Sequence, residues 1–149
     1  MTILLTAVAL WLSANFGLPS NHDLPRVALV PAAKINALYF GDKPSAEGMS
    51  RAANETGRHE IVSVYDDQSK TIYLPDGWTG STPAELSVLV HEMVHHFQNA
   101  AGMKHECPQE REKLAYEAQD RWLGLFGRDL QTEFQIDPFT LLVNTRCMY

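Results

Sequence analysis

TPAELSVLVHEMVHHFQN, residues 82–99, is the stretch of sequence that decides the predicted fold. It opens with a helix start, because the Thr82 hydroxyl can cap the Glu85 amide, Pro83 suits the first helical position, and the Glu85 carboxylate can reach back to Thr82. Apolar residues then continue the helical pattern until about Gly102, where a glycine favours its end. The stretch therefore predicts one long capped helix.

Inside this helix lies the motif His91-Glu92-Met93-Val94-His95. Four residues advance a helix by about 400°, so the two imidazoles stand one turn apart on nearly the same face and can share one metal ion. Zinc in catalytic sites takes three protein ligands and a water. Glu92 can accept a proton from a water that the metal activates. The motif predicts a zinc site with Glu92 as general base; the alternative is a helix with two surface histidines.

The two sides of this helix differ in chemistry. His91 and His95 cluster with Val88 and Gln98, and the opposite side is apolar, with Leu86, Val90, Met93 and Phe97. We expect the apolar side to pack and the histidine side to bind. His96 points away from the histidine pair, which indicates a structural or surface role.

A third zinc ligand has to come from downstream, where five residues compete: His105, Glu106, Glu110, Glu112 and Glu117. A second long helix is predicted from Pro108 to about Leu125. On that helix Glu112 shares the apolar side with Ala115, Tyr116, Gln119, Trp122, Leu123 and Phe126. Glu110 and Glu117 fall on the charged side with Lys113 and Arg121.

A carboxylate that faces the core is costly unless a cation or a metal pairs with it. Glu112 is therefore the favoured third ligand. Two alternatives remain. Glu112 can be an ordinary first-turn glutamate that the helix dipole stabilises, or the helix phase can be shifted so that Glu117 takes the ligand position.

Upstream of the metal helix the sequence predicts a β-hairpin. Two β-rich runs, 61–65 and 71–75, flank a polar turn. A short strand over 24–31 and a helix over 32–40 precede them, and residues 41–57 are rich in turn formers and predict a loop. We expect an α+β fold with a short antiparallel sheet packed on the metal helix and the C-terminal helix. The tail from 134 to 149 receives no assignment.

Composition bounds the class of protein. A chain of 149 residues, 45% hydrophobic and 20% charged, fits one globular domain. The net charge of −6 argues against nucleic acid as a partner, because a polyphosphate needs a Lys/Arg-rich surface.

The N-terminus lacks charge over its first eighteen residues and contains the apolar run Ile3–Leu12, followed by Ser13-Ala14. An apolar run before small residues predicts a secretory signal peptide over residues 1–20, and hence a secreted or periplasmic protein. An uncleaved anchor helix and an N-terminal core helix are the alternatives. The run is shorter than the ~20 residues that span a bilayer, so no stable membrane span is expected.

The chain has two cysteines, Cys107 and Cys147. In an oxidising compartment the pair predicts a disulfide that ties the C-terminal tail to the loop after the metal helix. Two free thiols, or Cys107 as a zinc ligand, are the alternatives.

The motif with its apolar frame, Leu89 to His96, resembles the zincin metallopeptidases. The element Glu112-Lys113-Leu114-Ala115 is similar to the Glu-x-x-Ala element by which many gluzincins supply a carboxylate ligand. Residues 61–123 look like the small metallopeptidase domains of bacteria, in which a hairpin strand precedes the metal helix. The resemblance implies a zincin-like domain over 24–149, in which Thr71–Leu74 forms the edge along which an extended peptide lies.

The chain also departs from these families. The better-known gluzincins carry an aspartate where this chain has Tyr116, so the partner that would orient a ligand histidine is unassigned. Metzincins place a third histidine six residues after the second, where this chain has Ala101. Tyr116 and His105 are the candidates by position for stabilising an oxyanion.

The expected reaction is hydrolysis of a peptide bond by metal-activated water. Glu92 would act first as base and later as proton donor to the leaving amine. The expected cofactor is Zn²⁺ and the expected partner a peptide or protein substrate. A zinc-binding regulatory module without catalysis and an amidase of cell-wall peptides are the alternative functions.

Overall fold

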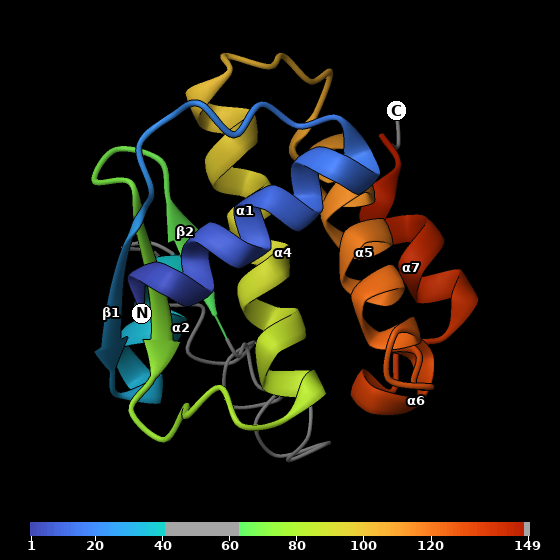
Figure 1. Cartoon of the computed structure of the whole chain (residues 1–149). Helices are drawn as coiled ribbons and strands as arrows, with labels where there is room; N and C mark the ends of the chain where they lie inside the picture. The colour runs from blue at the N-terminus through green and yellow to red at the C-terminus, as the bar shows by residue number, and fades with distance from the viewer. Residues whose placement is uncertain (41–62, 148–149) are drawn as a thin grey trace.

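The computed structural model describes residues 1–40 and 63–147, and these residues form an α+β fold, as expected. Helix α4, Pro83–Ala100, lies between a small sheet and helix α5, Pro108–Gly124, while α1 crosses over it (Figure 1). The predicted loop over 41–57 and the start of the predicted strand 61–65 lie outside the described residues.

The sheet consists of β1 (Arg26–Val30), β2 (Val64–Asp66) and β3 (Thr71–Pro75) in the order β1-β3-β2. The predicted hairpin is confirmed, because β2 and β3 pair antiparallel with Tyr65 opposite Ile72. Strand β1 adds to the other side of β3 in parallel, so the sheet is mixed.

Strand β3 is therefore the central strand of the described sheet, with a partner on each side. The edge role that the zincin resemblance implied for Thr71–Leu74 is wrong, because a strand paired on both sides has no free backbone groups for a peptide. Ile72 and Leu74 are fully buried, as befits a central strand. The edge strand that contacts α4 is β2.

The start of α4 combines the predicted cap with one difference. The Thr82 hydroxyl accepts a hydrogen bond from the Glu85 amide at 3.1 Å, as expected. The Glu85 carboxylate does not return to Thr82 and instead accepts from the amides of Thr79, Gly80 and Ser81. The loop folds back with Gly80 at φ 71°, so that three amides converge on one carboxylate oxygen. This convergence fixes the chain entry into α4.

Helix α4 is buried on all sides from Ser87 to Gln98. The apolar side packs, as expected, but the histidine side is covered too, because the sheet, α1 and α5 surround the helix and α5 contributes Glu112 and Gln119 to the histidine side (Figure 1). Its apolar side chains form the centre of the core: Val88, Leu89, Val90, Met93, Val94 and Phe97. The candidate ligands therefore sit on the most enclosed element of the fold.

Helix α1, Thr2–Phe16, is part of this core. It buries Leu5, Val8, Ala9 and Leu12 and leaves Ile3 and Leu10 exposed. This packing corresponds to the interpretation of the segment as an N-terminal core helix, while cleavage of residues 1–20 stays a prediction. Among the described helices, none is long and apolar enough to cross a membrane.

Two segments beyond α5 are helical although the sequence left them unassigned: α6, Leu130–Phe134, and α7, Pro138–Thr145. Both begin with an aspartate cap, in which Asp129 accepts from the Thr132 amide and Asp137 from the Thr140 amide. Helix α2, Ala32–Phe40, matches its predicted bounds.

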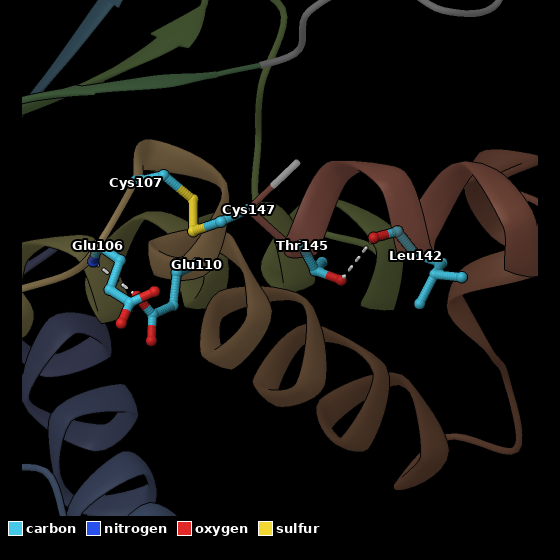
Figure 2. Close-up of a disulfide and its surroundings, with 6 residues drawn as sticks. All are labelled: Glu106, Cys107, Glu110, Leu142, Thr145 and Cys147. Carbon is cyan, nitrogen blue, oxygen red and sulfur yellow. Dashed lines mark hydrogen bonds between the residues drawn. A yellow bond between two sulfur atoms is a disulfide. The ribbon is translucent and has the colours of Figure 1, made fainter. Parts of the chain in front are cut away.

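The two cysteines form a disulfide that joins the start of α5 to the chain after α7 (Figure 2). The Cα atoms of Cys107 and Cys147 are 5.8 Å apart. The disulfide prediction is confirmed, and the alternatives of free thiols or a Cys107 zinc ligand are wrong. Helix α7 has no buried residue but lies against α5, and the disulfide adds a covalent link between the two.

Candidate metal centre

The structure brings together His91, His95 and Glu112, the three predicted ligands. Nε2 of His91 lies 2.9 Å from one Glu112 carboxylate oxygen, and Nε2 of His95 lies 3.1 Å from the other. Ligand atoms of the three residues are within 4.8 Å of one another. Glu112 reaches them from α5, across the contact between α4 and α5.

The competing ligands lie elsewhere. Glu117 is exposed on the other side of α5, in a surface hollow with Phe16 and Arg121. Glu110 accepts a hydrogen bond from the Glu106 amide near the disulfide (Figure 2). The helix phase is thus as predicted, with Ala115, Gln119 and Leu123 buried on the side of Glu112. Phe126, predicted on that side, lies beyond the helix end and is exposed.

The donor set and its spacing fit zinc. Three donors at about 2.0–2.1 Å from a tetrahedral ion stand about 3.3 Å apart. The nitrogen–oxygen distances of 2.9 and 3.1 Å are within a few tenths of an ångström of that value. Two imidazole nitrogens and a carboxylate also form a known type of catalytic zinc site, which keeps one position open for water.

Two glutamines hold the outer nitrogens of the histidines. Nδ1 of His91 is 2.9 Å from Oε1 of Gln119, and Nδ1 of His95 is 3.0 Å from Oε1 of Gln98. These two glutamines, rather than Tyr116, contact the outer nitrogens of the histidines. The sequence places Gln98 on the side of His95 and Gln119 on the side of Glu112, but sequence reasoning assigned neither a role. The signal that could have found them is helical spacing, because Gln98 follows His95 by three residues and Gln119 follows Glu112 by seven.

Glu92 is buried beside the first ligand. Its Oε1 accepts a hydrogen bond of 2.8 Å from the hydroxyl of Ser63, the residue before β2. Sequence reasoning missed Ser63, because a single serine 29 residues upstream belongs to no motif. The hydrogen bond fixes one carboxylate oxygen of the predicted base.

Two tyrosines lie near the ligands. The Tyr116 ring packs edge-on against His91 with 4.7 Å between centroids. Burial, and then the negative charge of Glu112, raise the pKa of Tyr116, so its hydroxyl keeps its proton at neutral pH. Partial burial and the charges of Glu112 and Glu92 also raise the pKa of Tyr39 in α2, which sequence reasoning missed. His105, the other positional candidate, is not part of the ligand group.

The members of the group shift one another's pKa. Burial alone would raise the pKa of Glu112, but hydrogen bonds and charge from His91 and His95 lower it far below its usual value. Burial would lower the pKa of His91, but Glu112 and Glu92 outweigh it and raise this pKa. Glu112 is thus held as a carboxylate, and the charged form of His91 is favoured beside it.

His96 has a structural role, as expected, and the surface alternative is wrong because the side chain is buried. Its Nε2 lies 2.6 Å from the Asp23 carbonyl oxygen and its Nδ1 lies 2.9 Å from the Tyr65 hydroxyl. It thereby ties α4 to the segment before β1 and to β2.

Arg111, next to Glu112, fixes the first turn of α5. Its guanidinium forms two hydrogen bonds of 2.9 and 2.6 Å with Asp67 in the β2–β3 turn. It also donates to the His95 carbonyl oxygen at 3.0 Å. Its own carbonyl accepts from Gln98 at 3.1 Å. These contacts set the approach of Glu112 to the histidines.

Comparison with known families assigns the chain. The profile of a domain of unknown function, DUF6647, matches residues 1–149. The chain belongs to this family. No curated protein and no solved structure matches the chain. The name of the family gives no activity.

Proposed function

We propose that the chain is a zinc-dependent hydrolase of peptide bonds, with zinc held by His91, His95 and Glu112. The observation that carries the proposal is the convergence of two imidazole nitrogens and a carboxylate at 2.9 and 3.1 Å. When each histidine carries its proton on Nδ1 and Glu112 is ionised, these atoms are all acceptors. A cation between them relieves the repulsion in that state, and their spacing fits a zinc ion.

Bound zinc supplies Lewis acidity, which lowers the pKa of water at the site to about 7. Glu92 would accept the proton of the attacking water and would pass it to the leaving amine. The hydrogen bond from Ser63 occupies Oε1 of Glu92, which leaves the other oxygen to carry the proton. The protonated Tyr116 hydroxyl is the proposed hydrogen-bond donor to the carbonyl oxygen of the substrate.

The proposed substrate is an extended peptide. Strand β2 has an edge without a strand partner among the described residues, and the residue before it, Ser63, contacts Glu92. A peptide that adds to this edge places its backbone beside the proposed base. The disulfide supports the proposed secreted or periplasmic location, because such bonds persist in oxidising compartments.

Metal analysis of protein purified without chelator, together with Glu92→Gln, tests the proposal. We expect both proteins to bind zinc and only the native chain to cleave casein or a peptide library, with a loss of at least about 10²-fold in the variant. Absence of zinc and of zinc uptake would refute the metal site. If both proteins bind zinc and are equally inert, the site is a binding module; cleavage of cell-wall fragments alone would make it an amidase.

A matched pair of glutamates tests the third ligand. Glu112→Ala should weaken zinc binding strongly, whereas Glu117→Ala, an exposed position on the same helix, should leave it unchanged. The reverse ranking would refute the assignment.

A further inference from the structure

Gln98 and Gln119 are buried, uncharged, and each is in contact with one ligand histidine. A side-chain amide has a donating and an accepting end, so its effect on a histidine depends on which end faces the ring. In both glutamines a second contact settles that orientation.

Gln98 is oriented by the backbone of α5. Its Nε2 donates to the Arg111 carbonyl oxygen at 3.1 Å, and a carbonyl oxygen can only accept. The amide nitrogen must therefore face Arg111, which leaves Oε1 toward His95 Nδ1 at 3.0 Å.

Gln119 is oriented by a relay through Ser87. The Ser87 hydroxyl donates to the Ala84 carbonyl oxygen at 2.7 Å, which uses its only proton. It is then an acceptor for Nε2 of Gln119 at 3.2 Å. Oε1 of Gln119 consequently faces His91 Nδ1 at 2.9 Å.

Because an amide oxygen only accepts, each histidine must carry a proton on Nδ1. Each Nε2 is then the nitrogen with a lone pair for a metal, and both Nε2 atoms face Glu112. The partner of the outer nitrogen decides which ring nitrogen binds a metal.

We propose that Gln98 and Gln119 are positioning residues that lock both histidines in the tautomer with Nε2 free for the metal. This inference rests on the proposed zinc site. The lock uses neutral amides, so it orients the rings without adding negative charge beside the ion. A carboxylate in the same place would orient the ring and attract the cation as well.

Zinc affinity, measured by competition with a chromogenic chelator, tests the lock. Gln119→Met keeps the length of the side chain but removes the amide, and we expect zinc to bind about 10–100-fold more weakly. Gln119→Glu restores an acceptor for Nδ1, and it should bind zinc at least as tightly as the native chain. Gln131→Met, at an exposed position in α6, is the matched control and should leave the affinity unchanged.

Nitrogen-15 spectra of the histidine side chains provide a readout that does not depend on affinity. In the zinc-loaded native chain we expect His91 and His95 to carry protons on Nδ1, and in Gln119→Met the Nδ1 proton of His91 should exchange faster with water. Gln98→Met gives the same test on His95 if Gln119→Met does not fold.

The outcomes separate the two proposals. If the native chain binds no zinc, the proposed function fails, and the lock fails with it. If the native chain binds zinc but the methionine variant binds it equally tightly, or the spectra place the protons on Nε2, the lock alone is refuted.

Discussion

Helix α1 makes a stability contribution that a truncation would reveal. Leu5, Val8 and Leu12 are almost fully buried against the core. Burial of a side chain of this type contributes about 1.5–3 kcal/mol, so the three together contribute about 6 kcal/mol. The free energy of unfolding of a whole domain is about 5–15 kcal/mol. A chain that starts at residue 21 should therefore lose a large share of its stability.

Two leucines of α1 form a matched test of this reasoning. Leu12 is fully buried and Leu10 is 60% exposed. Leu12→Ala should lower the free energy of unfolding by about 2–5 kcal/mol, whereas Leu10→Ala should change it by no more than about 0.5 kcal/mol. Urea titration followed by circular dichroism measures both. Equal stabilities of the two variants, or an unchanged urea midpoint in the truncated chain, would refute the assignment of α1 to the core.

The same magnitude bears on the predicted signal peptide. Cleavage near Ala14 would remove Leu5, Val8 and Leu12 from the core, so the cleaved chain should unfold at a lower urea concentration than the intact one. N-terminal sequencing of the protein isolated from the cells and from the medium shows which of the two forms exists.

Reduction of the disulfide should lower the free energy of unfolding by about 4 kcal/mol, because Cys107 and Cys147 close a loop of 40 residues in the unfolded chain. Urea titration with and without reductant measures this difference, and a loss below about 1 kcal/mol would contradict loop closure as the cause. Thr82→Ala should lower the free energy of unfolding by about 1 kcal/mol in the same titration, because the Glu85 amide loses its hydrogen bond to the Thr82 hydroxyl. An unchanged free energy would mean that the contacts of the Glu85 carboxylate with the loop amides are enough to start the helix. In protein freed of metal with a chelator, burial lowers the pKa of His91, but Glu112 and Glu92 raise it overall. The interaction of charged His91 with Glu112 therefore stabilises the fold. This contribution is fully present below pH 6.5 and is lost as the pH rises through the raised pKa. The stability difference between the native chain and Glu112→Gln should thus be larger near pH 6 than near pH 8, and thermal unfolding that shows a constant difference would contradict this linkage.

The local parts of the fold were predictable because their causes are local. The Thr82 cap and the apolar pattern of 83–100 predict α4 without knowledge of any other segment. The side of α5 on which Glu112 lies follows from helical periodicity alone, and the structure places it there. The aspartate caps of α6 and α7 are local signals of the same kind.

Features that depend on distant pairing were not predictable. The pairing of β1 with β3 joins Val27 to Ile72, and no local pattern in either strand specifies that partner. The central position of β3 and the burial of α4 on every side follow from this packing of distant segments. Ser63 likewise reaches Glu92 only because the hairpin lies against α4.

The two histidines and the carboxylate differ in how far the fold encloses them. His91 and His95 lie on a helix enclosed by the rest of the molecule, whereas Glu112 belongs to a neighbouring helix and leaves 33% of its side-chain surface exposed. Exchange of a bound ion with solvent would therefore begin with an outward swing of Glu112. The contact between Arg111 and Asp67 resists that swing, and so a pair of charges outside the ligand group would govern how quickly the ion dissociates.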